Sequence, residues 1–393
     1  MGGILFALSL ALYASLASHL GPLWPLLNKT SFGGDTRGSA SAMAHLTFEW
    51  KHPLFSISTW PLVELVARLF QVSKEASVGA TVAILAALNM ALAYAVLRRG
   101  VGRRSVAAGF TACYALLGAN LLIFGIPETY SASNLLILAY LFAFLARRDR
   151  LGSREALELG GISGLAALYN PPLISLAMIH SVYALRTRDW RKALGLAGAS
   201  LGVAAAIFLV VNVTAQAMNL DHRRAAEPHQ GLSAFYARSA EYAGRYLSIE
   251  HFSDSGMVAT VGAVFFLFGV VSRAEMLTAA PAARQVGETL RSPETGWIVL
   301  LYAALLLHAL ARCAKEKSPL ETSLLAWIGG LFLFYVYWQP WTATRFSPQI
   351  LAPLTLVLAR DFEHLRLRPK YYALAAFSLC LAVSNLSQLY GTR

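Results

Sequence analysis

Charged residues are scarce in this chain of 393 residues. Only 14% of its residues are Asp, Glu, Lys or Arg, against about 25% in a typical soluble domain. Hydrophobic residues make up 56%, and the few charges stand in short clusters between long apolar segments. This scarcity excludes an ordinary soluble globular protein and a disordered chain.

Cysteine is rare as well. Cys113, Cys313 and Cys380 lie in or at the ends of apolar segments and lack the spacing of metal ligands. So few cysteines exclude a disulfide-stapled secreted domain, and we expect them to pack as small apolar side chains. The N-terminus also lacks the basic residues that begin a cleavable signal peptide, so residues 3–26 are expected to persist as a helix.

Long apolar segments are the dominant feature. A membrane-spanning helix needs about 20 mostly apolar residues, because each backbone polar group must be satisfied within its own segment. The stretch 156–186 is broken at Asn170-Pro171-Pro172 and predicts two short spans joined by a tight turn. The other candidate spans are 3–26, 77–97, 105–125, 131–146, 193–216, 297–313, 319–338, 346–360 and 370–389. We therefore expect an all-α, polytopic membrane protein with about eleven transmembrane helices in a single domain, residues 1–393.

The basic residues indicate how these spans are oriented. Cytoplasmic loops of membrane proteins carry an excess of Lys and Arg. The loops 126–130, 169–172 and 339–346 contain a single basic residue, Arg345, and are expected outside. The five clusters expected in the cytoplasm are Arg98–Arg104, Arg147–Arg154, Arg186–Lys192, Arg312–Lys317 and Arg360–Lys370. The N-terminus is then inside and the C-terminus outside, as in a multi-pass protein of a bacterial cytoplasmic membrane. The net charge of +12 is explained by basic residues that stand in the predicted cytoplasmic loops. No nucleic-acid partner is therefore expected.

Two further apolar stretches would disturb this alternation if they crossed the membrane. The stretch 53–70 is amphipathic, with Glu64 and Arg68 on one side at helical spacing, and predicts a helix lying in the outer interface. The stretch 255–272 is long enough to cross, but residues 274–293 are too polar to return. We expect a re-entrant or interfacial helix there.

On this topology the outer side carries the two substantial loops, 27–76 and 217–293, while the cytoplasmic loops are short and basic. Any chemistry is therefore expected outside. In the first loop, Gly33 and Gly34 let the backbone turn sharply and bring the Asp35 carboxylate near the membrane surface. Taken alone, the same residues are more typical of an Asx turn or a helix N-cap.

Other outer residues permit both a functional and a plain structural interpretation. Glu49, Lys51 and His52 directly precede the interfacial helix, where a Lys is also a common headgroup anchor. Glu128 stands in a short loop before a predicted span, where an acid is also a favourable partner for the helix dipole. The remaining outer residues of interest are Tyr130, His222, Tyr242, Trp341 and Arg345.

Five features, taken in order along the chain, resemble the GT-C superfamily of integral-membrane glycosyltransferases over roughly residues 1–360. They are Gly34-Asp35 after the first span, Lys51-His52-Pro53-Leu54 before the amphipathic helix, Glu128 in the next outer loop, the Gly-rich span that ends at Asn170-Pro171-Pro172, and Arg345 before Ser347-Pro348. The superfamily includes aminoarabinose-lipid A and protein O-mannosyl transferases, which use polyprenyl-phosphate sugars. This chain has Thr36-Arg37 where many members have a second acid and a tyrosine.

The resemblance implies inverting transfer of a sugar from a polyprenyl-phosphate donor to a lipid, glycan or protein acceptor. Asp35 would be the general base that takes the proton from the acceptor hydroxyl. The charge on the leaving phosphate would be stabilised by Lys51, His52 and Arg345. The residues that would bind the acceptor or the sugar are Arg37, Glu49, Glu128, Tyr130, His222, Tyr242 and Trp341. No cofactor is required, although Asp35 and Glu128 are a possible pair of ligands for a divalent cation.

A donor carried by a membrane lipid also suits the outer side, where nucleotide sugars are not expected. A lipid or solute transporter, including a flippase, is the main alternative. Transporters usually show inverted repeats and polar residues within broken helices. The sequence contains no convincing repeat, and His180 and His308 are the main ionisable residues within its predicted spans. A non-catalytic membrane scaffold is the third interpretation. The identities of the sugar and acceptor do not follow from the sequence.

Overall fold

The computed structural model describes residues 1–24, 36–46, 52–187, 190–217, 293–338, 347–365 and 369–390. All regular elements within these ranges are helical, as the long apolar segments predict. The α-helices are α1 (Gly2–Leu20), α3 (Thr36–His45), α4 (Pro53–Phe70), α5 (Lys74–Gly100), α6 (Arg104–Leu116), α7 (Gly118–Ile123), α8 (Thr129–Arg147), α9 (Ser153–Ala167), α10 (Ala177–Thr187), α11 (Trp190–Ala217), α17 (Pro293–Glu316), α18 (Pro319–Trp338), α19 (Ser347–His364) and α20 (Lys370–Tyr390). The short 3-10 turns are η1 (Gly21–Leu23), η2 (Arg148–Arg150) and η3 (Pro171–Leu176).

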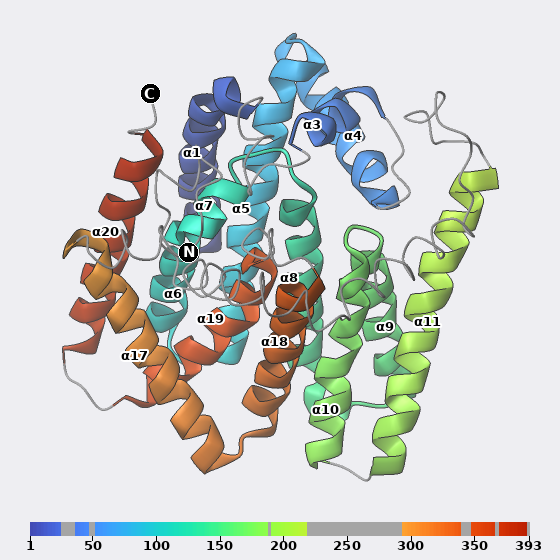
Figure 1. Cartoon of the computed structure of the whole chain (residues 1–393), viewed down its shortest axis with the longest axis vertical. Coiled ribbons are helices and arrows are strands. Elements are labelled where there is room, and N and C mark those ends of the chain that lie inside the picture. Colours follow the sequence, from blue (N-terminus) through green and yellow to red (C-terminus); the bar gives the residue numbers. More distant parts are fainter. Residues whose placement is uncertain are drawn as a thin grey trace.

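Most of these helices stand side by side in a bundle, with α3 and α4 lying across one end of it (Figure 1). Helix α5 packs against α1, α4 and α8. Helix α1 runs antiparallel to α5, since Gly2 lies beside Tyr94 and Gly79 lies beside Ala17. The large core between the helices includes the fully buried side chains of Tyr13, Trp327 and Phe144.

Four helices in the described part of the chain are long and apolar enough to cross a membrane, where eleven spans were expected. They are α1, α5, α8 extended to Arg150, and α11 as far as Val211. Local features account for much of the difference. Helices α9 and α10 have only 15 and 11 residues, and α19 carries Arg360, Asp361 and Glu363 near its end. The stretch 255–272 lies outside the described residues.

The prediction of one helix over 105–125 was wrong. Helices α6 and α7 are separated at Leu117, whose backbone is extended (φ −58°, ψ 133°). At this break the Asn120 side-chain amide donates a hydrogen bond of 2.6 Å to the Tyr114 carbonyl. A side chain thereby takes over a backbone acceptor in the apolar core, where an unpaired carbonyl would be costly.

The predicted break at Asn170-Pro171-Pro172 is confirmed, because α9 and α10 are separate helices joined through η3. Proline lacks the N–H that a continuing helix requires. The buried Ser163 hydroxyl of α9 is shared between the carbonyls of Leu173 and Ile174, at 3.2 and 2.8 Å. This contact folds the turn back onto α9.

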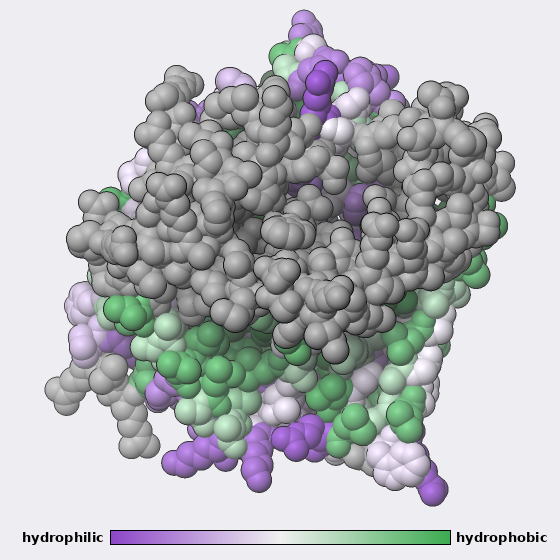
Figure 2. Space-filling view, viewed as in Figure 1, coloured by the Kyte–Doolittle hydropathy of each residue, from purple (hydrophilic) through white to green (hydrophobic). Residues whose placement is uncertain are grey.

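The described members of the five basic clusters gather at one end of the bundle, which we call the basic end. Helices α5, α8, α10, α17 and α19 all finish there (Figure 1), and Figure 2 shows hydrophilic residues along this lower edge beneath a hydrophobic band. The Glu363 carboxylate accepts hydrogen bonds from the backbone N–H groups of Gly102 and Arg103, at 2.9 and 2.8 Å. The opposite end, which carries α3 and α4, is called the outer end.

A buried set of ion pairs, called the ion cluster, joins α17, α18 and α19 near the basic end. Arg312 lies 2.5 Å from Asp361 and 2.7 Å from Glu321, and Arg360 lies 3.0 Å from Glu321. Arg360 also donates to the Gly100 carbonyl of α5 at 2.8 Å. The side chains of Glu321 and Asp361 are 0% and 1% exposed, so each carboxylate depends on its arginines.

The two histidines within the predicted spans are both engaged. His180 of α10 is buried and hydrogen-bonded to Tyr140 of α8 at 2.7 Å. His308 of α17 lies 2.7 Å from Asp361 and is thus attached to the ion cluster. These two histidines were the main ionisable residues expected within the spans. The structure adds the buried carboxylates of Glu321 and Asp361.

Close packing of α9 against α11 depends on two glycines. A Cβ atom at Gly160 would lie 2.5 Å from the Ser200 carbonyl oxygen, and one at Gly164 would lie 2.8 Å from the Ala204 Cα. These neighbours are backbone atoms that cannot rotate away. The Gly-rich composition of α9 thus permits the close approach of α11, as small residues do between membrane helices.

We expect Glu321→Gln to destabilise the fold by about 3–5 kcal/mol, because it removes the charge of the buried carboxylate that Arg312 and Arg360 share. Glu316→Gln is the matched control: its side chain is 49% exposed and also pairs with Arg312, and such a pair contributes about 0–1 kcal/mol. Thermal unfolding of both variants in detergent measures the difference. Equal melting temperatures would contradict the role given to the ion cluster.

Gly160→Ala is expected to destabilise the protein by about 1–3 kcal/mol through overpacking against α11. The adjacent Gly161→Ala should be neutral or mildly stabilising, since its new Cβ would lie 4.0 Å from Ile207 and alanine favours helix. Melting temperatures of the two variants under the same conditions provide the measurement. A stable Gly160→Ala would show that α9 and α11 do not pack so closely.

Candidate functional site

Glu128 is the best-defined acidic residue at the outer end. It is the residue before α8, has extended backbone, and its side chain is only 3% exposed. The positive end of the α8 dipole favours a negative charge at this position. The Thr36 hydroxyl, at the start of α3, donates to Glu128 Oε1 at 3.3 Å. Two segments 92 residues apart in the sequence therefore meet at one carboxylate.

His52, the residue before α4, is held by the turn that follows α9. Its Nδ1 lies 2.5 Å from the Tyr169 carbonyl oxygen. Because a carbonyl only accepts, Nδ1 carries the proton, and Nε2 of a neutral ring is then the acceptor nitrogen. The Tyr169 hydroxyl in turn bonds Ser58 of α4 at 2.5 Å. The N-terminus of α4 is thus attached to the turn that Asn170 begins.

A small second hydrophobic core joins these pieces. It contains Met43 of α3, Phe55 of α4, Val82 of α5, Ala132 of α8 and Tyr169. We call it the outer core. Its members come from α3, α4, α5, α8 and the turn after α9, so its packing holds α3 and the starts of α4 and α8 at the same end of the bundle.

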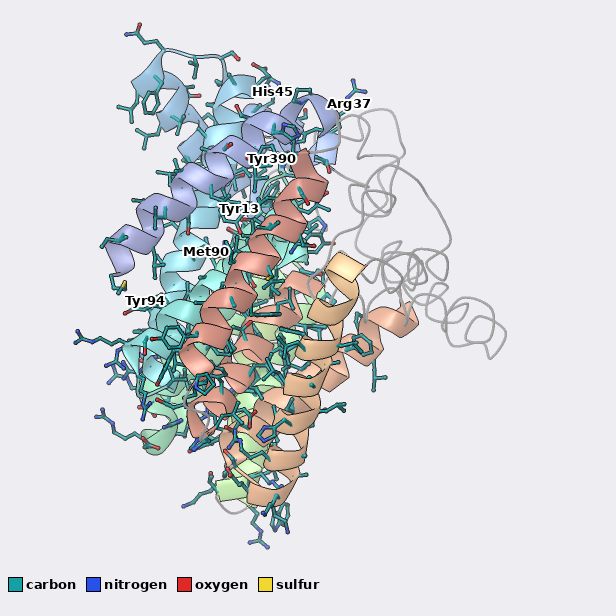
Figure 3. All side chains as sticks on the ribbon, turned by 90° about the vertical axis from the view of Figure 1, so that its left-hand side faces the viewer. Tyr13, Arg37, His45, Met90, Tyr94 and Tyr390 are labelled. Carbon is teal, nitrogen blue, oxygen red and sulfur yellow. The ribbon has the colours of Figure 1, made fainter. Side chains whose placement is uncertain are left out.

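Two further predicted residues differ in their surroundings. Tyr130 is buried, 5% exposed, and belongs to the large core. Arg37 follows Thr36 and has an exposed side chain. Figure 3 shows Arg37 near His45 at the upper end, far from Tyr94. Of the two, Arg37 is the side chain that a ligand can reach without displacing the core.

Buried amides and hydroxyls continue below Glu128, and the sequence interpretation missed them. Asn134 of α8 donates to Asn89 of α5 and to the Tyr114 hydroxyl of α6, each at 2.7 Å. Asn89 donates to the Ser131 carbonyl at 2.8 Å. Gln349 of α19 donates to Ser133 at 3.3 Å. Asn residues within apolar helices were the available signal, because such groups need partners inside a membrane.

These polar contacts set the position of the first turns of α8. Four elements, α5, α6, α8 and α19, meet there through side-chain hydrogen bonds rather than apolar packing alone. A helix start fixed in this way holds Glu128 in one place. Chemically, a buried carboxylate at a helix N-terminus is suited to accept hydrogen bonds from hydroxyl groups of a polar ligand.

Several predicted site residues lie outside the described part of the chain. Nothing in the structure tests the roles expected for them, and the same holds for the loop 217–293. These residues are Asp35, Glu49, Lys51, His222, Tyr242, Trp341 and Arg345. Within the described ranges, no group of three or more His, Cys, Asp or Glu residues is arranged to hold a metal ion.

The attachment of α4 to α5 should depend on pH. Hydrogen bonds from Lys74 and then Arg68 lower the pKa of Glu64 below its ordinary 4.5. A carboxyl with a lowered pKa stabilises the fold above its ordinary value and loses that contribution as pH falls through the folded pKa. The melting temperature of the wild type should therefore exceed that of Glu64→Gln near neutral pH, and the gap should close below 4.5. A gap that is constant with pH would contradict this.

Comparison with models of known protein families, with curated proteins and with solved structures gives no match for this chain. The resemblance to the GT-C superfamily therefore depends on the order of five short sequence features, and the functional roles attached to it remain predictions. In the structure, Thr36 and Glu128 are in contact. Helices α3 and α4 come together over the start of α8.

Proposed function

We propose that this protein is an inverting membrane glycosyltransferase of the GT-C type, which transfers a sugar from a polyprenyl-phosphate donor to a lipid, glycan or protein acceptor. The contact between Thr36 and Glu128 is the observation that carries the proposal. Thr36 directly follows the Gly34-Asp35 pair that resembles the superfamily's first acidic motif. Its contact with Glu128 joins the segment after the first apolar helix to the acid of the next outer loop.

Placement in a membrane is the first part of the proposal. Four long apolar helices, exposed apolar side chains and the collection of basic residues at one end all support it. Large apolar side chains such as Leu8, Val210 and Leu379 are 62–64% exposed, a pattern typical of helices that face lipid. With the basic end in the cytoplasm, the outer core faces the other side. The remaining helices then cross as shorter or broken spans.

The chemistry proposed for the outer end needs one base and one cationic site. Asp35 takes the proton from the acceptor hydroxyl, the acceptor oxygen forms the new bond to the anomeric carbon, and the bond to the lipid phosphate breaks. Lys51, His52 and Arg345 stabilise the phosphate that leaves. Glu128 and Arg37 bind hydroxyl groups of the sugar or acceptor. The hydrogen bond from His52 Nδ1 to the Tyr169 carbonyl holds the imidazole at the start of α4.

A lipid transporter is the second candidate, and one observation favours it. Two helical segments are interrupted beside polar side chains, at Leu117 with Asn120 and at Pro171 with Asn170. Interrupted helices with polar side chains are typical of transporter binding sites. However, Asn120 is occupied with the Tyr114 carbonyl, so at least one interruption is stabilised internally.

The deciding experiment measures transfer of a labelled sugar from a panel of polyprenyl-phosphate donors by the full chain in vesicles. Loss of a general base lowers turnover by about 10²–10⁴-fold, which is the effect expected of Asp35→Asn. Glu128→Gln should mainly raise KM for the donor or acceptor, because it keeps the shape of the side chain and removes its charge. Glu75→Gln, at an exposed side chain of the outer end, is the matched control and should retain activity.

Two outcomes would contradict the proposal. Full activity of Asp35→Asn would remove the proposed base. Absence of transfer from every donor, together with measurable movement of a lipid across the bilayer, would establish the transporter instead. Monodisperse elution of each variant in detergent excludes misfolding as the cause of a loss.

A further inference from the structure

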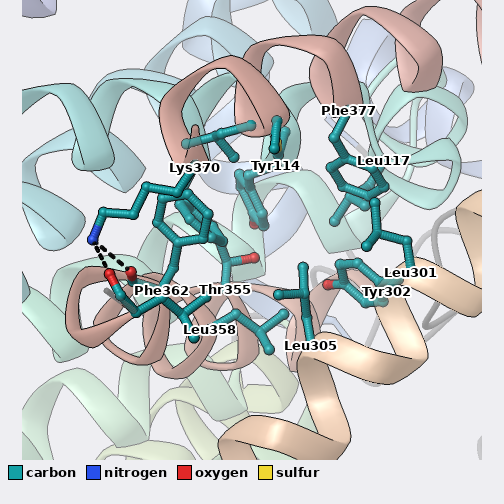
Figure 4. A pocket seen from close by; sticks show the side chains of 15 residues that line it. Tyr114, Leu117, Leu301, Tyr302, Leu305, Thr355, Leu358, Phe362, Lys370 and Phe377 are labelled. Carbon is teal, nitrogen blue, oxygen red and sulfur yellow. Dashed lines mark hydrogen bonds between the residues drawn. The ribbon is translucent and has the colours of Figure 1, made fainter. Parts of the chain in front are cut away.

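A cavity of about 140 Å³ lies between α6, α17, α19 and α20. Figure 4 shows the side chains around it, among them Tyr114, Tyr302, Phe362 and Phe377. Its wall extends toward the basic end, because it includes Phe362 of α19 and Lys370, the first residue of α20. None of the predicted glycosyltransferase residues within the described ranges lines it.

Polar groups on the cavity wall are bonded within the protein. Lys370 Nζ donates to three carbonyls, including that of Leu365 at 2.7 Å. The Tyr114 hydroxyl accepts a hydrogen bond from the Asn134 side-chain amide at 2.7 Å. The Thr355 hydroxyl donates one to the Leu351 carbonyl at 2.7 Å. The surface that remains for an occupant is therefore aliphatic and aromatic. An engineered apolar cavity of similar size, about 150 Å³, stays dry and binds benzene.

The cavity has an exposed mouth and a buried floor. Leu301 of α17, 39% exposed, and Ala373 of α20, also exposed, lie at the mouth. Tyr114 of α6 and Leu117, the residue between α6 and α7, form the floor, and each is 1% exposed. The opening therefore lies between α17 and α20, and it leads from the surface of the bundle to the main core.

The two helices at the mouth expose large apolar side chains. Leu300 and Leu307 of α17 are each 67% exposed, and Leu379 and Val383 of α20 are each 64% exposed. In the membrane placement proposed above, these side chains contact the hydrocarbon of the bilayer. A hydrocarbon chain can thus enter the cavity sideways without passing through water.

Charge at the nearby helix starts indicates which lipid headgroup suits this position. Arg103, the residue before α6, and Arg104, its first residue, are both exposed. The helix that forms the cavity floor therefore carries exposed cations at the basic end. Juxtamembrane cations of this kind attract anionic lipids of the same leaflet.

We propose that this cavity binds one acyl chain of an anionic phospholipid from the leaflet at the basic end. The proposal depends on the membrane placement and not on glycosyl transfer. Tyr114 connects the cavity to the outer half of the bundle, because its ring lines the floor while its hydroxyl is bonded to Asn134. A bound chain thus contacts a side chain on which the start of α8 also depends.

Photolabelling tests the proposal directly. The full chain is placed in vesicles that contain a trace of phosphatidylglycerol with a diazirine at the end of one acyl chain, irradiated, and analysed by peptide mass spectrometry. We expect labels on floor residues such as Cys113, Tyr114 and Leu117. Ala373→Trp, which fills the mouth, should reduce this labelling several-fold, whereas Ala376→Trp, on the exposed face of the same helix, should leave it unchanged.

Three results would overturn the proposal. Labels confined to exposed residues such as Leu307 would show that no chain enters the cavity. Equal labelling in the two tryptophan variants would show that entry does not use this mouth. Equal labelling by a phosphatidylcholine probe would reject the anionic headgroup. If Ala373→Trp does not elute as a single species, Leu301→Trp fills the mouth from α17. No sugar donor is present, so the result is independent of the transfer assay.

Discussion

A polar group buried in an apolar bundle raises the free energy of the fold by several kcal/mol unless it has a partner, and most of this structure follows from that constraint. The buried Glu128 carboxylate accepts a hydrogen bond from the Thr36 hydroxyl. The buried Asn134 amide donates one to the Asn89 side chain. The Glu321 carboxylate lies between two arginines. In each pair the partner comes from another helix. Pairing therefore determines which helices are neighbours and which ends they share.

The two ends of the bundle consequently differ in kind. At the basic end, Arg312 and Arg360 join α17, α18 and α19 through buried carboxylates and tie them to α5. Such a network favours one arrangement of these helices because its charges cannot be left unpaired. At the outer end, α3 and α4 are held by a small apolar core and a few hydrogen bonds.

Much of the helical pattern followed from the sequence, because apolar periodicity and proline act locally. The helix at 53–70 and the break at Asn170 were predicted, and the structure contains both. The continuous helix over 105–125 was wrong. Its interruption depends on Asn120 reaching a carbonyl six residues back, a contact that hydropathy does not register. The polar side chains Asn89 and Gln349 were missed for a similar reason, since each depends on a partner from a distant helix.

The sequence by itself determined that the chain is helical and apolar, and that its basic residues are confined to particular loops. These properties follow from composition and spacing, which act over one or two helical turns. Only the tertiary structure decided that Thr36 meets Glu128, that His52 is held by Tyr169, and that four helices enclose an apolar cavity. Contacts between segments far apart in the chain depend on how the helices pack, and no local pattern of residues encodes that packing.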